Sequence, residues 1–324
     1  MRRREFLSVL GAAALLGSKA DAAPRTYRLA AMNPAFPMPE GSPFGDIIIK
    51  AMAKYGYVVG QNLIYDSLCP MGDVAKIAPM LAELKSRGAD AIIIIGYPTA
   101  VAAKAIGIPI VAAVGLGDPV ATGLIQSQAH PGGNLTGISD VAAMLSTKRL
   151  SLLKELSPKL RKVAMLWNKD DLGMTQRYAT SAKSAEAMGF SVQALGVAEP
   201  DDFEEAFAAM KAEHPDAILM VTDSLTNLNR KRVFEFAAAR KLPAIYEYDF
   251  LARDGGLMSY GPDIGESFDR AAALVDRIFK GANPGDLPFE EPTRYPLVVN
   301  LKTARAMGLE IPPNLLALAD EVLE

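Results

Sequence analysis

The chain has 324 residues, of which half are hydrophobic and 22% are charged. This composition is typical of a globular protein, and the length favours two lobes over one. The 34 basic and 37 acidic residues give a formal net charge of −3, so the basic excess expected of a nucleic-acid-binding protein is missing. One cysteine, Cys69, has no partner for an internal disulfide. The two histidines, His130 and His214, stand far apart, so we expect no metal site, no cofactor and no histidine-based catalysis.

The first 22 residues have the pattern of a signal peptide. Three arginines at residues 2–4 precede an apolar run over residues 6–17, which is too short for a transmembrane helix of about 20 residues. The small–x–small sequence Ala20-Asp21-Ala22 is typical of a cleavage site. We therefore expect export to the periplasm with cleavage near Ala22. Residues 3–7 resemble a twin-arginine signal, which makes the twin-arginine route possible beside general secretion.

Strand and helix patterns alternate after the signal peptide. Apolar runs predict strands over residues 28–32, 62–66, 91–96 and 110–114, and helical spacing predicts helices over 45–55 and 74–87. The run over 91–95 is apolar throughout, which is typical of a strand buried on both faces of a parallel sheet. The first part of the chain is therefore predicted to form an open doubly wound sheet.

The same order restarts after residue 160. Strands are predicted over residues 162–167, 191–195, 216–221 and 244–246, and helices over 175–188, 201–213, 229–240 and 264–280. The strings at residues 90–94 and 216–220 resemble each other, and each precedes a further strand that follows a proline. The fold class is therefore α/β, with two Rossmann-like lobes of one architecture, each built on a parallel sheet.

Three extended segments are candidates for the connections between the lobes, at residues 131–137, 255–261 and 295–300. Glycine clusters suit a hinge, because glycine tolerates large changes of φ and ψ, although ordinary surface loops use the same residues. The candidate hinge residues are Gly137, Gly256 and Tyr260. Several parallel connections would restrict the lobes to opening and closing.

These connections divide the chain into two discontinuous lobes. We expect an N-terminal lobe from residues 25–138 plus about 264–292. The C-terminal lobe is expected from residues 139–263 plus about 293–324. The ligand cleft would lie between them.

Loops that follow parallel strands line the ligand crevice of such folds. The candidate ligand-binding residues are Asn33, Phe36, Tyr97, Pro98, Thr99, Asp118, Asp223, Ser224, Tyr246 and Glu247, with Tyr248 beside them. The carboxylates can hold an ammonium group, the hydroxyls and helix-start amides can receive an anion, and the aromatic rings can flank an apolar body. Such a site suits a small zwitterion such as an amino acid. The alternatives are structural: hydroxyls as helix caps, Asp118 as a turn residue and Tyr246 as part of the core.

Several long strings resemble the ABC-transporter substrate-binding family that includes the tryptophan-binding TrpX-type proteins. They are residues 242–247, 254–261, 299–309, 311–313 and 319–321, together with 118–119, 131–137 and 148–150 in the middle of the chain. These strings occur in family order and cover nearly all of the mature chain. The sequence departs from the family in the proline-rich loop over residues 32–40 and at Tyr97, where many members have a smaller residue.

The resemblance implies a periplasmic binding protein of type I, whose lobes are joined by a multi-strand hinge. Such a protein captures a small molecule by lobe closure and delivers it to the membrane permease of an ABC importer, without chemistry of its own. Family members with known ligands bind aromatic or similar amino acids. The family's site residues carry over to the loop at Tyr97–Thr99, to Asp118, to Asp223-Ser224 and to Tyr246-Glu247. The two departures touch the expected cleft, so the ligand itself does not transfer.

Two other functions stay open at this point. The same fold can act as a periplasmic sensor that passes closure to a signalling receptor. An enzyme, for instance a hydrolase using Asp223 or Glu247, has the weakest support, because no nucleophile motif, metal set or positioned histidine accompanies these carboxylates. We expect a monomer, because two mobile lobes must present their faces to a membrane partner.

Overall fold

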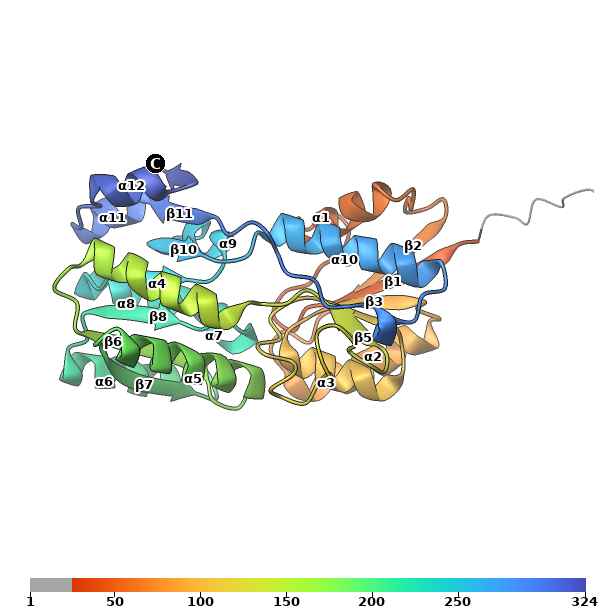
Figure 1. Cartoon of the computed structure of the whole chain (residues 1–324), viewed down its shortest axis with the longest axis horizontal. Coiled ribbons are helices and arrows are strands. Elements are labelled where there is room, and N and C mark those ends of the chain that lie inside the picture. Colours follow the sequence, from red (N-terminus) through yellow and green to blue (C-terminus); the bar gives the residue numbers. More distant parts are fainter. Residues whose placement is uncertain (1–24) are drawn as a thin grey trace, which may run out of the picture.

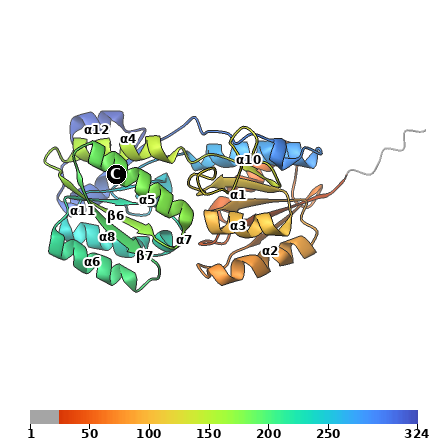
Figure 2. The ribbon, with the colours of Figure 1, turned by 60° about the horizontal axis from the view of Figure 1, so that its bottom comes forward.

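The computed structural model describes residues 25–324. The predicted signal peptide lies outside these residues. Two α/β lobes lie side by side, each with helices on both faces of a sheet (Figures 1 and 2). The predicted fold class is confirmed: both sheets are mostly parallel, and the arrangement is that of a type I periplasmic binding protein.

Within residues 25–324, the N-terminal lobe contains a five-stranded parallel sheet in the order β2-β1-β3-β4-β5. Its strands are β1 (Tyr27–Met32), β2 (Leu63–Leu68), β3 (Ala91–Ile95), β4 (Ile110–Val114) and β5 (Leu135–Gly137). Its helices are α1 (Pro43–Ala53), α2 (Ile77–Ser86), α3 (Tyr97–Ile106) and α10 (Ile264–Phe279), with 3-10 turns η1 (Val74–Lys76) and η2 (Pro284–Asp286). One apolar cluster lies under α1 and α10, and another lies under α2 and α3. Both faces are covered, which explains why β3 reads as an unbroken apolar run.

The C-terminal lobe, again counted over the described residues, contains a seven-stranded sheet in the order β12-β11-β10-β9-β8-β6-β7. Its strands are β6 (Lys162–Asn168), β7 (Ser191–Val197), β8 (Ala217–Met220), β9 (Ala244–Tyr246), β10 (Met258–Tyr260), β11 (Leu297–Asn300) and β12 (Glu321–Leu323). Its helices are α4 (Ala142–Leu156), α5 (Leu172–Ala187), α6 (Asp202–Glu213), α7 (Ser224–Leu228), α8 (Arg230–Arg240), α9 (Asp249–Arg253), α11 (Leu301–Met307) and α12 (Pro313–Leu318). Two apolar clusters again fill the two faces.

In the described part of the chain, three segments connect the lobes: β5 to α4, β10 to α10, and η2 to β11. Two of them pair by backbone hydrogen bonds, since Glu290 N–H donates to Gly137 O at 3.0 Å and Ser139 N–H donates to Glu290 O at 2.8 Å. The third joins them through Asp263 N–H, which donates to Arg294 O at 3.0 Å. These bonds hold the crossings together as one multi-strand connection.

The third crossing explains the antiparallel β10–β11 pair. A strand of the parallel part of this sheet ends at the cleft, whereas β11 starts there because the chain re-enters from the other lobe. β11 must therefore run against β10. The segment 295–300, which the sequence suggested as a crossing, is mostly this strand, and the crossing lies just before it.

The three candidate hinge residues differ in position. Gly137 ends β5, and its Cα packs so closely on Ala112 that a side chain would collide with the neighbouring strand. Gly256 lies inside the C-terminal lobe, where a Cβ would stand 2.7 Å from the Tyr246 ring. Tyr260 ends β10, where the second crossing begins. Close packing therefore explains both glycines, and Gly137 and Tyr260 each end a strand from which a crossing begins.

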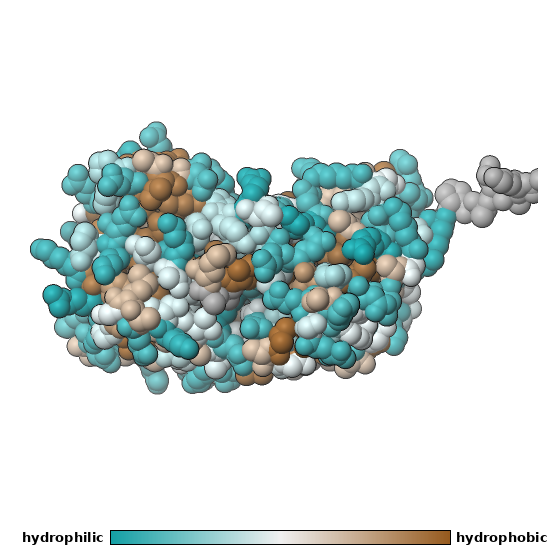
Figure 3. Space-filling view, in the orientation of Figure 1, coloured by the Kyte–Doolittle hydropathy of each residue, from teal (hydrophilic) through white to brown (hydrophobic). Residues whose placement is uncertain are grey.

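Hydrophilic side chains cover most of the face shown in Figure 3, and apolar residues on it form separate small groups. Over the described residues, no helix combines the length and the apolar character that crossing a bilayer would need.

Candidate functional site

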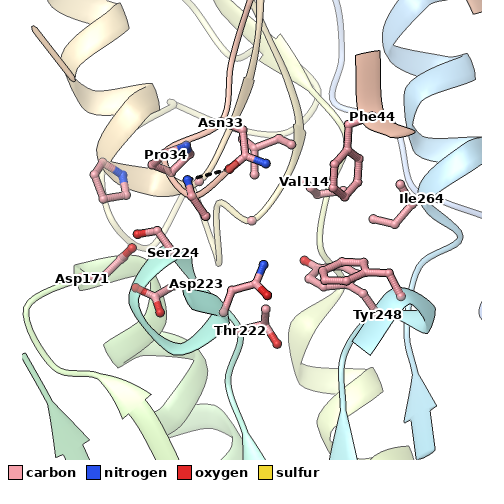
Figure 4. A pocket seen from close by; sticks show the side chains of 17 residues that line it. Asn33, Pro34, Phe44, Val114, Asp171, Thr222, Asp223, Ser224, Tyr248 and Ile264 are labelled. Atoms are coloured by element: carbon pink, nitrogen blue, oxygen red, sulfur yellow. Dashed lines mark hydrogen bonds between the residues drawn. The ribbon is translucent and has the colours of Figure 1, made fainter. Parts of the chain in front are cut away.

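A cavity lies between the lobes, where the strands of both sheets end (Figure 4). It contains about 570 Å³ of empty space, part of it open to solvent. The residues that line it are Asn33, Pro34, Ala35, Phe44, Ile95, Gly96, Pro98, Val114, Gly115, Asp171, Thr222, Asp223, Ser224, Asn227, Tyr248, Phe250 and Ile264. Both lobes contribute, so the cavity depends on how the lobes meet.

One side of the cavity is aromatic and aliphatic. Phe44, Tyr248 and Ile264 face one another there in Figure 4. Tyr248 stacks on Phe250 with ring planes 8° apart and centroids 5.8 Å apart, and the Phe44 ring stands edge-on to Phe250 at 5.8 Å. Val114 closes the wall from β4. This side can bury an aromatic or branched apolar body.

The other side carries two carboxylates, Asp171 and Asp223, beside Ser224 (Figure 4). Asp223 caps α7: one carboxylate oxygen accepts from Thr226 N–H at 2.8 Å and the other accepts from Asn168 Nδ2 at 2.6 Å. Burial nevertheless raises the pKa of Asp223 above its ordinary value, although these hydrogen bonds oppose the shift. Asp223 is therefore a buried carboxylate held in place by neutral donors.

Asp171 caps α5 and accepts from Met174 N–H at 3.1 Å. Burial, and after it the negative charge of Asp223, raises the pKa of Asp171 to about 7. Within residues 25–324, neither Asp171 nor Asp223 forms an ion pair. The two carboxylates thus form a buried acidic pair without an ion-pair partner in the described chain, although the charge of Arg177 partly opposes the rise in the pKa of Asp171.

Two further polar atoms on the cavity wall lack partners. Thr222 Oγ1 and Asn227 Oδ1 are buried and have no hydrogen bond within the described part of the chain. Buried polar atoms are rarely left unpaired, so atoms of this kind in a cavity indicate a ligand or an ordered water. With the two carboxylates, Asn227 makes this side rich in acceptors. An ammonium group fits it best, and Ser224 and Thr222 add hydroxyl donors for a carboxylate.

Four of the sequence-predicted residues line the cavity together: Asn33, Pro98, Asp223 and Ser224. Asn33 shapes the loop after β1, because its Oδ1 accepts from Ala35 N–H at 2.8 Å in a local turn (Figure 4). The start of the proline-rich loop, residues 33–35, therefore forms part of the cavity wall.

Four others lie around the cavity but do not line it. Phe36 lines a neighbouring groove, where the Arg230 guanidinium carbon lies 5.1 Å from the centroid of the Phe36 ring. Tyr97 lines another hollow, which shares Pro98 and Asp171 with the cavity. Thr99 is fully buried in the first turn of α3, and its Oγ1 has no partner in the described chain. Asp118 caps a turn by accepting from Val120 N–H at 3.0 Å, beside a hollow at the crossings.

The last two predicted residues are built into the C-terminal lobe. Tyr246 is 1% exposed, and its ring packs edge-on against Phe234 in the core. Glu247 is buried, and its carboxylate is shared between Arg149 at 3.2 Å and Arg177 at 2.6 Å. Both of its oxygens therefore already have partners within the chain.

Glu247 belongs to a buried ionic cluster, defined here as Asp140, Arg149, Arg177 and Glu247. Arg177 also pairs with Asp140 at 2.7 Å. Asp140 lies at the first crossing and accepts two backbone N–H groups, at 3.0 and 2.6 Å, from the loop after β4. Arg149 Nε donates to the Tyr260 carbonyl at 2.6 Å, at the second crossing. The ionic cluster therefore ties two crossings to one another.

The ionic cluster also reaches the cavity. Glu247 Oε2 accepts from the backbone N–H of Thr222 at 3.0 Å, and Arg177 interacts with the Tyr248 hydroxyl. Thr222 and Tyr248 both line the cavity. The buried charges thus position two cavity residues that follow β8 and β9.

Sequence reasoning missed several lining residues, chiefly Asp171, Phe44 and Asn227. Asp171 lies three residues beyond the end of β6, and it begins a helix. Phe44 lies in the first turn of α1, twelve residues after β1 ends, so no rule about post-strand loops points to it. A signal for Asp171 does exist, since Asp171 precedes a helical pattern as a capping residue would.

The fold defines the class: a two-lobed protein of the type I periplasmic binding protein fold, with a cavity between its lobes. The family model for "ABC transporter substrate binding protein" matches residues 45–323, so the chain belongs to this family. This confirms the resemblance seen in the sequence. The family is one of solute-binding proteins and not of enzymes, as expected, and its members are typically extracytoplasmic.

Individual relatives are more distant. A "Tyrosine-binding protein" of Clostridioides difficile (strain R20291) is 26% identical over 264 residues, which cover 81% of this chain and 75% of the relative. An ABC domain in complex with L-Trp from Streptococcus pneumonia has a TM-score of 0.81 at 23% identity, covering 92% of this chain and all of the other. A ligand-free, open substrate binding protein with adhesive properties from Clostridium difficile has a TM-score of 0.63 at 23% identity, covering 92% and 99%.

Proposed function

We propose that this protein is the extracytoplasmic solute-binding component of an ABC importer and that it captures an amino acid with an aromatic or bulky apolar side chain. One observation carries the proposal: two buried carboxylates without a cationic partner in the described chain lie across one cavity from an aromatic wall. A ligand that matches both sides has an ammonium group at one end and an apolar body at the other.

The charge argument disfavours two other ligand classes. A ligand with only a carboxylate would add a third negative charge beside Asp171 and Asp223, which costs free energy in a buried site. A sugar would leave the carboxylates without a counter-charge and would lose contact with the aliphatic part of the wall. An amino acid supplies the missing cation, and its carboxylate can accept from Ser224 and from amides in the first turn of α3.

The relatives support this class. The printed names of two of them refer to tyrosine and tryptophan, which are amino acids of the shape described above. The chain also superposes better on the tryptophan complex than on the ligand-free open structure, at equal identity. This supports a closed arrangement of the lobes here. The lobe divisions expected from the sequence are kept as part of the proposal.

Closure supplies the mechanism of capture. The ligand touches both lobes only when they meet, so it shifts a pre-existing open–closed equilibrium by its higher affinity for the closed state. The closed face would then be recognised by the permease. A periplasmic sensor for a signalling receptor would use the same closure. Neighbouring genes for a permease and an ATPase would favour transport.

The test is a melting-temperature panel on the mature chain from Ala23, unfolded and refolded to remove bound ligand. L-tryptophan, L-tyrosine and L-phenylalanine are compared with tryptamine, which lacks the carboxylate, and indole-3-propionate, which lacks the amine. A ligand at 100 times its dissociation constant should add about 2.7 kcal/mol of stability, a shift of several degrees. We expect the amino acids to shift the melting temperature most and indole-3-propionate not at all.

The panel also tests the charge argument. A shift with indole-3-propionate equal to that with L-tryptophan would contradict an ammonium site at the two carboxylates. A flat response to all amino acids, with a shift produced by sugars, would overturn the proposed ligand class.

A further inference from the structure

We infer that Phe44 and Phe250 form a partition that limits the length of the ligand's side chain, and that the groove beyond it can take an apolar extension. This rests on the proposed function and adds a specificity determinant to it. Three residues, Phe44, Phe250 and Ile264, line both the cavity and a second, larger hollow. The two hollows therefore lie back to back.

The partition is assembled from both lobes. Phe44 lies in the first turn of α1 in the N-terminal lobe, and Phe250 lies in α9 of the C-terminal lobe. Their ring centroids are 5.8 Å apart with an interplanar angle of 86°. Each ring packs on a second aromatic ring, Phe44 on Phe268 at 6.1 Å and Phe250 on the stacked Tyr248 at 5.8 Å, which itself lines the cavity. The two rings thus form a firm wall when the lobes meet.

The orientation of the ligand follows from the charges. Its ammonium group belongs at Asp171 and Asp223, on the opposite side of the cavity from Phe44 (Figure 4). The far end of its side chain is therefore directed at the partition. A side chain longer than the cavity must either displace these rings or be excluded.

The second hollow has room and the right chemistry for such an extension. It encloses about 1,080 Å³ of empty space, much of it open to solvent, and its apolar lining includes Phe36, Pro37, Pro43 and Ile47. Its charged groups already have partners: Arg230 with Asp254 at 2.6 Å, Asp249 with Arg253 at 3.1 Å and Asp263 with Arg294 at 3.2 Å. A groove of apolar residues and paired charges suits an uncharged aromatic group.

The test compares L-phenylalanine with L-4-phenylphenylalanine, which carries a second ring at the para position. Isothermal titration calorimetry gives both dissociation constants for the wild type and for Phe44→Ala and Phe250→Ala. We expect the wild type to prefer phenylalanine by at least about tenfold. Each variant should shift the ratio of the two constants by about tenfold or more towards the longer ligand. Phe36→Ala is the matched control, because Phe36 lines the outer groove and not the partition.

The outcomes are separable. An unchanged ratio in both partition variants, with phenylalanine still bound by the wild type, overturns the partition and leaves the proposed function standing. An equal shift in Phe36→Ala also overturns it. Failure of the wild type to bind any aromatic amino acid overturns both. If an alanine variant does not fold, as judged by circular dichroism, Phe44→Leu and Phe250→Leu give the same comparison with a smaller change of volume.

Discussion

The lobes meet at a pair of glycines, and a single methyl group placed there should hinder closure. Gly173 is the second residue of α5, and Gly117 belongs to the loop after β4 in the other lobe. A Cβ on Gly173 would stand 2.7 Å from the Leu116 carbonyl oxygen and 3.0 Å from Tyr97 Cβ. Real Cβ atoms do not come this close to backbone atoms, so Gly173→Ala requires the two lobes to separate slightly.

The alanine should affect ligand affinity and the stability of the ligand-free protein in opposite directions. Overpacking of this kind costs about 1–3 kcal/mol, and it applies only where the lobes touch. The ligand should therefore bind about 5- to 150-fold more weakly, at about 1.4 kcal/mol per factor of ten. In the open protein the same alanine favours the helix by about 0.5–1 kcal/mol relative to glycine. Affinity should fall while the ligand-free protein keeps or gains stability.

Calorimetry with L-tryptophan measures the affinity, and small-angle scattering measures the radius of gyration with and without ligand. Gly265→Ala is the matched control: Gly265 is the second residue of α10, and the nearest atom to its Cβ is Asp263 Oδ1 at 3.1 Å. We expect the control to bind and compact like the wild type. Unchanged affinity and full compaction in Gly173→Ala would refute the reasoning.

The ionizable groups give three further predictions. Burial raises the pKa of Asp171 to about 7, so the protonated side chain contributes up to about 4 kcal/mol to the free energy of unfolding of the ligand-free protein. This contribution is complete below about pH 4 and is lost as pH rises through 7. Relative to Asp171→Asn, which should still cap α5, wild-type stability from urea unfolding should therefore fall between pH 4 and 8, and parallel curves would contradict this. Affinity for an ammonium ligand should rise with pH up to about 7 in the wild type, and it should be weaker and rise less with pH in Asp171→Asn, where only Asp223 is left to titrate; calorimetry at several pH values would test this. In the ionic cluster, Glu247→Gln leaves Arg149 and Arg177 buried with less counter-charge and should cost about 3–5 kcal/mol of unfolding free energy. The exposed pair Lys54–Asp269 is the comparison, where Asp269→Asn should cost at most about 1 kcal/mol; equal losses in the two variants would refute a structural role for the buried charges.

The fold followed from the sequence because apolar periodicity is a local signal. The runs at 91–95 and 110–114 became β3 and β4 with almost the expected bounds. The antiparallel β11 did not follow, because its direction is set by where the chain crosses between lobes, and no local pattern records that.

The site was harder to predict, because a side chain's direction depends on tertiary packing. Asp223 and Ser224 follow β8 directly and reach the cavity. Glu247 follows β9 in the same way, yet it turns towards Arg149 and Arg177, whose helices cover the sheet. Phe44 reaches the cavity from the start of a helix. Loop position alone therefore pointed to the region of the cavity, and charge pairing decided which carboxylates face it.

The most direct test of the central claim is the structure of the complex with L-tryptophan. The account predicts a closed protein with the ligand nitrogen within about 2.7–3.2 Å of an oxygen of Asp171, Asp223 or Asn227, and the indole ring against Phe44 and Tyr248. A ligand bound in the outer groove, or one whose carboxylate faces the two aspartates, would contradict it.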